Sequence, residues 1–262
     1  NIIDPFHLEA YGETTVNYNR DVEIFPVLNA MFERIYGESP YKSPTDMGVN
    51  MAGFCIVDDA ACRRASEQEI IRRYYQSLCS LRQGLSEQEE VFKLELLMNQ
   101  IGLKPESRAV VPAALARAEE TGAPAVAMEL PNGKLVTGKT SPLLGASSAC
   151  LLNALKCLGG IPEDVLLISP NIIEPIQHLK VEHMGNHNPR LHTDEVLIAL
   201  SICAVTDPNA ERAMEQLAAL AGGEVHSTVI LSRVDENVFQ HLRMNLTCEP
   251  KYQTKKLYHG KK

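Results

Sequence analysis

The most concentrated group of polar side chains in the sequence lies between Gly12 and the start of a predicted helix. It combines hydroxyl, amide, carboxylate and guanidinium groups from Glu13, Thr14, Thr15, Asn17, Asn19, Arg20 and Asp21. Such a mixture can donate hydrogen bonds to a small ligand and accept them, and the free amides at a helix N-terminus favour an anion. The run therefore predicts a site for an anionic or phosphorylated small molecule or nucleotide. A loop that only satisfies its own backbone would use the same residue types.

A second group of chemically active side chains lies in the segment that ends at His192. Three imidazoles there could ligate zinc or another metal, at positions His183, His187 and His192. Arg190 could hold a phosphate or a carboxylate. Glycine and proline interrupt the segment, so it is a predicted loop, and the spacing of the histidines implies no ligand geometry. We predict anion or substrate binding here, assign no metal ligand, and leave metal binding by this loop open.

Two histidines are the candidates for acid–base catalysis, because imidazole titrates near neutral pH. They are His192 and His7, and Arg20 and Arg190 are the predicted anion-binding side chains. We expect the two polar segments to line one cleft, in part of an enzyme of unknown reaction and unknown cofactor. The alternative is a non-catalytic module for oligomerisation or ligand binding, and fold analogy cannot separate the two classes.

Two further polar segments have weaker claims to chemistry. His226 and Ser227 begin a predicted strand, where neighbouring side chains point to opposite faces, so they cannot act as each other's base and nucleophile. The loop from Ser43 to Asn50 is rich in polar groups and could line the same cleft as the first run.

The first half of the chain is predicted to be helical. Apolar residues three and four positions apart indicate a helix over residues 21–36, and a long helix is expected after residue 58. Ser86 and Glu89 match a capping box, which predicts a helix that runs to residue 102. Another helix is expected after Pro105, with Pro112 at a kink or in the true first turn.

The second half alternates strands and helices. An Asn-Gly turn joins two strand-like segments into a predicted hairpin. Strands are predicted at 125–130, 134–137, 165–168, 225–231 and 245–248. Helices are predicted at 142–158, capped by Ser141, and at 171–178, 193–205, 208–220 and 234–243.

These elements predict an α/β (α+β) fold, with a mixed sheet layered with helices and a separate helical subdomain. The expected boundaries are a polar segment with the first helix at 1–57, a helical subdomain at 58–122, and a three-layer α/β subdomain at 123–262. The order hairpin, helix, strand, helix over residues 125–168 resembles the core of the cytidine-deaminase-like fold. The zinc motifs of that family are missing at Ala146 to Cys150 and downstream, so a zinc deaminase is not expected.

Several stretches resemble the bacterial DUF1846 family, also called uncharacterised protein family 0371. They are Asp4 to His7, Tyr11 to Asp21, Ser43 to Asn50, Asn188 to His192 and His226 to Ile230. In members of this family about as much sequence again precedes these segments, including a glycine-rich stretch that resembles a phosphate-binding loop. This sequence has no such loop and does not start with Met, so the resemblance implies a C-terminal part that an upstream half completes. The family brings no assigned reaction.

Composition narrows the classes of partner. The formal net charge of −8 is spread along the chain without a basic stripe, which argues against nucleic acid. No apolar run has the length of roughly 20 residues needed to cross a bilayer, so no membrane partner is expected. We expect a cytoplasmic protein whose partners are a small anionic ligand, the upstream half and a possible second copy of the chain.

The cysteines generate a first testable prediction. The sequence has seven, widely scattered and without a Cys-x-x-Cys pair, at Cys55, Cys62, Cys79, Cys150, Cys157, Cys203 and Cys248. This pattern is typical of reduced thiols in a cytosol. Thiol titration in denaturant should count all seven as free, and elemental analysis should find no zinc that thiol alkylation releases. A lower thiol count in material from a reducing compartment would contradict the prediction.

Overall fold

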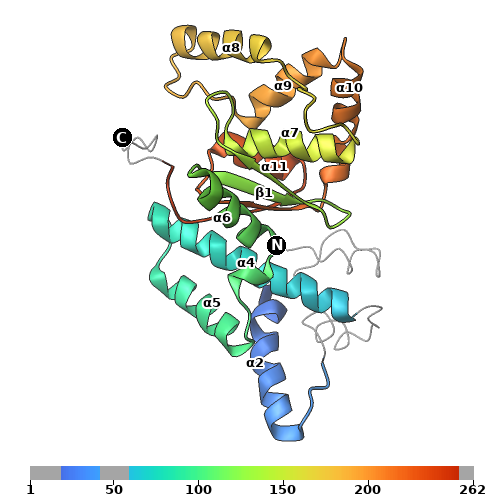
Figure 1. The fold of residues 1–262 in the computed structure, drawn as a ribbon. Coiled ribbons are helices and arrows are strands. Elements are labelled where there is room, and N and C mark those ends of the chain that lie inside the picture. The colour runs from blue at the N-terminus through green and yellow to red at the C-terminus, as the bar shows by residue number, and fades with distance from the viewer. Residues whose placement is uncertain (1–18, 42–58, 254–262) are drawn as a thin grey trace. The chain divides into compact units, whose positions relative to one another are not determined.

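The computed structural model describes residues 19–41 and 59–253 (Figure 1). The chain divides into two compact units, Asn1–Arg108 and Ala109–Lys262. No described helix combines the length and the apolar composition that a membrane span requires.

The described part of the first unit is helical, as the sequence predicts. Helices α2 (Asn19–Tyr36), α4 (Asp59–Gln83) and α5 (Gln88–Gln100) form it, and α5 packs on both of the others. Apolar side chains of α4 and α5 are buried: Ile70, Ile71, Tyr75, Val91, Leu97 and Met98. The predicted capping box is wrong, because Glu87 is the N-cap and the buried Ser86 hydroxyl makes no hydrogen bond within the described structure.

The second unit is built on one mixed sheet, which confirms the predicted sheet type. Its strands are β1 (Ala125–Glu129), β2 (Leu135–Lys139), β3 (Glu224–Ser227) and β4 (Asn245–Cys248), in the order β2-β1-β3-β4. Strand β1 is antiparallel to β2 and β3, whereas β3 and β4 are parallel. The β1–β2 turn uses Gly133 at φ +77°, a conformation that glycine adopts without strain.

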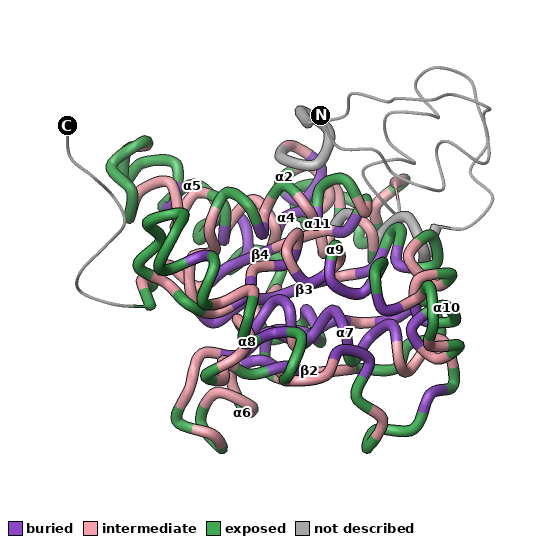
Figure 2. Tube along the Cα trace, turned by 90° about the horizontal axis from the view of Figure 1, so that it is seen from above, coloured by how far each residue is buried: buried purple, intermediate pink, exposed green. Residues whose placement is uncertain are grey.

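Helices cover both faces of this sheet (Figure 1). Helix α6 (Val110–Thr121) lies on one face, and α7 (Ala146–Leu158) and α11 (Arg233–His241) lie on the other. Alternate residues of β1 serve the two sides: Val126 and Met128 join the main core with α7, and Ala127 packs with Val110 and Ala114 of α6. In Figure 2, β3 and α7 run through the buried centre.

Three further helices complete the second unit on the α7 side. They are α8 (Pro170–His178), α9 (Thr193–Cys203) and α10 (Pro208–Glu215). Helices α9 and α10 both contact α7, and α9 also contacts α11. A short π-helical turn, η2 (Leu179–His183), continues α8, and a 3₁₀ turn, η3 (Leu217–Leu220), follows α10.

Helix α6 begins later than the sequence indicates. Residues Pro105–Ser107 form a separate 3₁₀ turn, η1, and α6 starts at Val110. Pro112 therefore lies in the first turn, where its missing N–H removes no helical hydrogen bond. The sequence predicts this helix as part of a helical subdomain over residues 58–122, and in the structure it packs on the sheet of the second unit.

Two other element boundaries are corrected by side-chain hydrogen bonds. Ser141 does not cap α7: its hydroxyl accepts from the amides of Leu143 and Leu144, and this turn delays α7 to Ala146. Strand β3 ends at Ser227, well before residue 231, because the Ser227 hydroxyl donates to the Val229 carbonyl and accepts from the Val229 amide.

The strand predicted at 165–168 does not form. Leu167 and Ile168 are buried, but this segment pairs with no strand and Leu166 is exposed. A short apolar run bounded by Gly and Pro can be a buried strand or a buried loop, and the periodicity of its apolar residues does not distinguish a strand from a loop.

The close approach of β2 to α7 generates a stability prediction. A Cβ built on Gly138 would lie 2.1 Å from the Cys150 backbone nitrogen. Gly138→Ala should therefore push α7 off the sheet and lower the free energy of unfolding by about 3 kcal/mol, the upper end for overpacking. Urea denaturation measures the change.

Gly122→Ala is the matched control, because Gly122 has φ +62° and open space around its Cβ position. It should cost about 1 to 2 kcal/mol through backbone strain alone. Equal losses in the two variants would contradict the close-packing argument.

Candidate functional site

His192 lies where the loop before α9 passes the start of α7. Leu191 and Leu144 form a parallel bridge, in which the Leu191 amide donates to the Leu143 carbonyl at 3.0 Å and the Gly145 amide donates to the Leu191 carbonyl at 3.2 Å. The buried Ser148 hydroxyl donates to the same Leu191 carbonyl at 2.9 Å. The N-terminal ends of α7 and α9 are therefore brought together directly beside His192.

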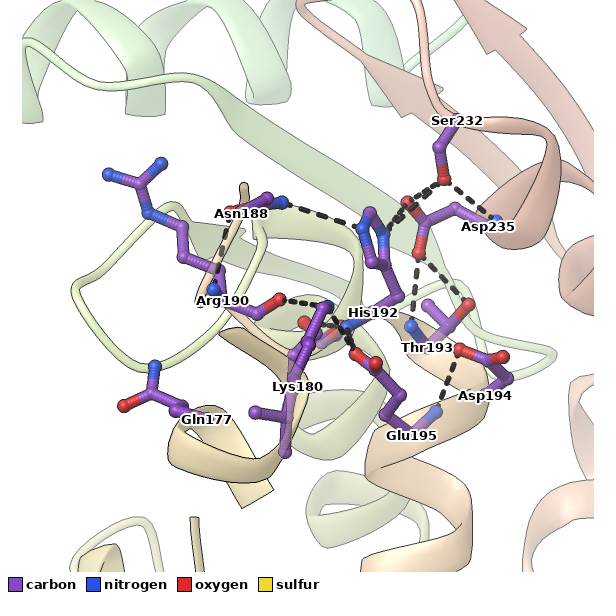
Figure 3. Close-up of polar contacts among 12 residues, drawn as sticks. Gln177, Lys180, Asn188, Arg190, His192, Thr193, Asp194, Glu195, Ser232 and Asp235 are labelled. Carbon is purple, nitrogen blue, oxygen red and sulfur yellow. Dashed lines mark hydrogen bonds and ion pairs between the residues drawn. The ribbon is translucent and has the colours of Figure 1, made fainter. Parts of the chain in front are cut away.

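Asp235 is the central partner of His192 (Figure 3). Its Oδ2 lies 3.0 Å from His192 Nδ1 and accepts a 2.8 Å hydrogen bond from the Ser232 hydroxyl. Its Oδ1 accepts from the amide and the hydroxyl of Thr193, both at 3.0 Å. This carboxylate, with 10% of its side chain exposed, joins the start of α11 to the start of α9.

Ser232 is placed as a helix cap, which distinguishes the site from a Ser-His-Asp triad. Its hydroxyl accepts from the Asp235 amide at 3.2 Å and lies 3.3 Å from His192 Nδ1, the nitrogen already facing Asp235. A serine nucleophile would have to meet Nε2, the opposite ring nitrogen. Ser232 therefore orients the carboxylate and the ring.

Asn188 sets the surroundings of the outer nitrogen of the ring. The Asn188 Oδ1 accepts from the Arg190 amide at 3.2 Å, which directs its Nδ2 toward His192 Nε2 at 3.4 Å. With Nδ1–H donated to Asp235, Nε2 carries the lone pair in the neutral ring. The arrangement thus presents Nε2 as a hydrogen-bond acceptor, and 26% of the His192 side chain remains exposed.

A second charge pair holds the backbone of the same residue. Glu195 Oε2 accepts from the His192 amide at 2.8 Å and from Lys180 Nζ at 2.6 Å. Lys180, in the π-helical turn, has 4% of its side chain exposed and also donates to the Arg190 carbonyl at 2.8 Å. A buried ammonium needs such partners, so Lys180 ties the loop to α9.

Arg190 extends from this loop toward the entry of α7. Its Nε donates to the Ser141 carbonyl at 2.8 Å. In Figure 3 its guanidinium lies on the far side of Asn188 from the imidazole. Arg190 and His192 therefore belong to one loop, and the Asn188 side chain lies between the Arg190 guanidinium and the His192 imidazole.

The pKa values of the histidine and the aspartate move in opposite directions. The hydrogen bond with Asp235 raises the pKa of His192 above its ordinary value, although burial opposes this. Burial acts to raise the pKa of Asp235, but its hydrogen bond with His192 and the imidazolium charge together hold it below its ordinary value. Both directions favour an ion pair between the two side chains.

Most of the other predicted site residues lie outside the described structure. His7, Thr14, Thr15 and Asn17 are among them, as is the Ser43 to Asn50 loop. Asn19, Arg20 and Asp21 begin α2, but only their backbone is described. The shared cleft of Arg20 and Arg190 therefore stays a prediction.

The three histidines of the segment that ends at His192 do not gather into one cluster in the described structure. Among the described residues, no three His, Cys, Asp or Glu side chains gather as metal ligands, so His183 and His187 do not join His192 around an ion.

The interpretation of His226 as a sheet residue agrees with the structure, because this buried ring faces the Thr247 hydroxyl at 2.8 Å across β3 and β4.

His192 and Arg190 are predicted site residues, whereas the sequence did not predict Asp235, Ser232 and Lys180, which hold the ring and the loop in the structure. The Ser-x-x-Asp spacing of Ser232 and Asp235 before a helix was an available signal, since it matches the capping pattern. Nothing local marks Lys180, whose partner Glu195 is 15 positions away.

Comparison with known proteins identifies the relatives of this chain. Residues 1–102 match the model described as "Domain of unknown function DUF1846, N-terminal", and residues 106–258 match "Domain of unknown function DUF1846, C-terminal". The similarity is therefore not confined to a C-terminal domain.

Two curated relatives illustrate the similarity. The chain is 58% identical over 258 residues to "UPF0371 protein str1377" of Streptococcus thermophilus (strain CNRZ 1066), and 56% identical over 258 residues to a "UPF0371 protein" of Streptococcus pneumoniae (strain JJA). Each match covers 98% of this chain and 52% of the relative. The chain thus spans about half the length of these relatives.

The ion pair generates a prediction for Asp235→Asn. Removing the carboxylate charge should lower the pKa of His192, which NMR titration of its ring protons measures. Asp194→Asn is the control, because the Asp194 carboxylate accepts from the Glu195 amide and is not a partner of the ring. Equal His192 titration in the wild-type chain and Asp235→Asn would refute the pairing.

The same pair predicts how stability depends on pH. A raised folded pKa means that the contribution of His192 is complete below about pH 6.5, the unfolded value, and is lost as pH rises through the folded pKa. The lowered pKa of Asp235 makes its contribution complete above about pH 3.9, and that contribution is lost as pH falls through the folded pKa. The stability advantage of the wild-type chain over Asp235→Asn should therefore peak between the two folded pKa values. Urea denaturation across pH checks this, and a pH-independent advantage would contradict it.

Proposed function

This chain belongs to the DUF1846 family, whose function is unknown, and we propose that it binds a small phosphorylated or carboxylated molecule beside His192. In this proposal the chain is part of an enzyme in which Arg190 holds the anion and His192 exchanges a proton with the ligand. The polar run that ends in Arg20 and Asp21, together with His7, remains a proposed contributor.

The observation that carries the proposal is the start of α7 beside the loop of Arg190 and His192. The N-cap of α7 is Gly145, and no side chain caps this helix end. A helix N-terminus carries a partial positive charge and amides that favour an anion. Arg190 is held at the turn before this helix through Ser141, so its other guanidinium donors supply charge where an anion would sit.

His192 supports proton transfer at the same place. With Nδ1 facing Asp235, Nε2 can take a proton from a ligand hydroxyl or a water, and Asp235 stabilises the imidazolium that forms. The raised pKa of His192 also suits the reverse step, in which the ring returns the proton. The proposed reaction class is therefore acid–base chemistry on an anionic ligand.

A non-catalytic module is the second candidate, and the surface of α9 favours it. Ile198 and Ile202 are exposed one turn apart on α9, and the exposed Val205 follows the helix. Apolar side chains gathered on one helix face are typical of a protein contact. In this second candidate, His192 and Asp235 serve only to join α9 and α11.

The likeness to the cytidine-deaminase-like fold also remains a proposal. The β1–β2 hairpin followed by α7 supports it, but the strand expected at 165–168 does not form, and α8, α9 and α10 lie between α7 and β3. Helix α7 starts with Ala146 and Ser147, without the zinc motif. The likeness concerns the fold alone.

We also propose a cytoplasmic location, because the five described cysteines are all free thiols.

Phosphate titration followed by NMR tests the proposed site. Inorganic phosphate should shift the amide signals of Ala146, Ser147, Arg190 and His192. Arg190→Gln should weaken phosphate binding by about 1.5 to 3 kcal/mol, the size of a charged hydrogen bond. Arg212→Gln, which removes an exposed guanidinium from α10, is the matched control. Shifts spread over the surface, or equal losses in the two variants, would leave the non-catalytic module as the better account.

A further inference from the structure

We propose that His178 and His183 form a two-ligand surface site for a late first-row divalent cation such as Zn²⁺ or Ni²⁺. The site is distinct from the anion site proposed beside His192. It rests on the geometry of the π-helical turn that follows α8.

The π-helical turn brings the two histidines to the same side of the chain. In an α-helix, residues five apart are rotated by about 140° around the axis, so their side chains diverge. Here Leu179–His183 is π-helical, and the Met184 amide donates to the Leu179 carbonyl five residues earlier at 3.1 Å. This wider turn places the imidazoles of His178 and His183 with ring centroids 5.8 Å apart.

The spacing of the rings fits a shared cation. Metal–nitrogen distances of about 2.0–2.1 Å on each side hold two ligating imidazole centroids roughly 5 to 6 Å apart. The planes of the two rings are inclined at 59°, so the rings are not stacked face to face. Both residues are exposed, so an ion can reach them without opening the fold.

The coordination chemistry indicates the class of metal and the kind of site. Neutral imidazole suits Zn²⁺, Ni²⁺ and Cu²⁺, whereas Mg²⁺ and Ca²⁺ prefer oxygen ligands. No third ligand gathers here among the described residues, so water or an external group would fill the remaining positions. A structural zinc site uses four protein ligands, and a two-histidine site is therefore exchangeable.

Occupancy of this site would act on the segment that carries Lys180. His178 and His183 flank the turn whose Lys180 side chain reaches inward to Glu195 and the Arg190 carbonyl. A cation that bridges the two rings fixes both ends of this turn. Because the cation binds the folded state, it should also raise the midpoint of thermal unfolding.

Titration with Ni²⁺ tests the proposal, since thiolates compete more strongly for Zn²⁺ than imidazoles do and would confuse a zinc titration. Calorimetry should find one Ni²⁺ per chain, and the paramagnetic ion should broaden the ring-proton signals of His178 and His183 before those of other histidines. Zn²⁺ should restore these signals by displacement. Affinity should fall in acid, because an imidazole must be deprotonated to bind a metal ion.

Variants locate the site. His178→Asn and His183→Asn should each weaken Ni²⁺ binding by roughly tenfold or more, because even the loss of a group behind a metal ligand costs that much. His241→Asn removes another exposed histidine of the same unit and should leave the affinity unchanged. Unchanged affinity in both site variants, or first broadening at His187 or His192, would overturn the proposal. Because the probe is a cation, either outcome leaves the phosphate test at Arg190 unaffected.

Discussion

The Asp235 carboxylate is the interaction on which the arrangement around His192 depends. A buried carboxylate is costly unless donors surround it, and here the donors come from two helices that are distant in sequence. The Thr193 amide and hydroxyl lie at the start of α9, and the Ser232 hydroxyl lies at the start of α11. Satisfying one charge therefore fixes both helix starts, and the orientation of the imidazole follows from it.

The Lys180 and Glu195 pair constrains the other side of the same residue. Asp235 acts on the His192 ring, while Glu195 acts on the His192 amide and Lys180 on the Arg190 carbonyl just before it. The loop is thus held by two charge pairs that share no atom. The π-helical turn supplies Lys180, whose side chain is buried while its neighbours Leu179 and Val181 are exposed.

Local patterns predicted most of the elements, local side-chain hydrogen bonds moved some of their boundaries, and long-range hydrogen bonds built the surroundings of His192. The β1–β2 hairpin and β4 lie where the Asn-Gly turn and the strand composition place them, and α9 starts at the expected residue. The predicted start of α7 was wrong because the Ser141 hydroxyl accepts from an amide of the turn before the helix and does not cap the helix itself. His192 was a visible candidate, but Asp235 lies 43 positions away, and no periodicity or spacing connects residues that meet only after the sheet and its helices are packed.

The exposure of His192 helps to decide whether the His192–Asp235 pair exchanges protons with a ligand or only joins the starts of α9 and α11. A contact that only joins two helix starts gains little stability from ionisable groups, because apolar side chains of similar volume often stabilise a buried contact equally well. A neutral donor would also satisfy Asp235, and Thr193 already provides two hydrogen bonds to it. The imidazole adds a second nitrogen that faces away from the carboxylate and a pKa raised by it. The second nitrogen contributes nothing to joining the helices, and both properties are what proton exchange with a ligand requires.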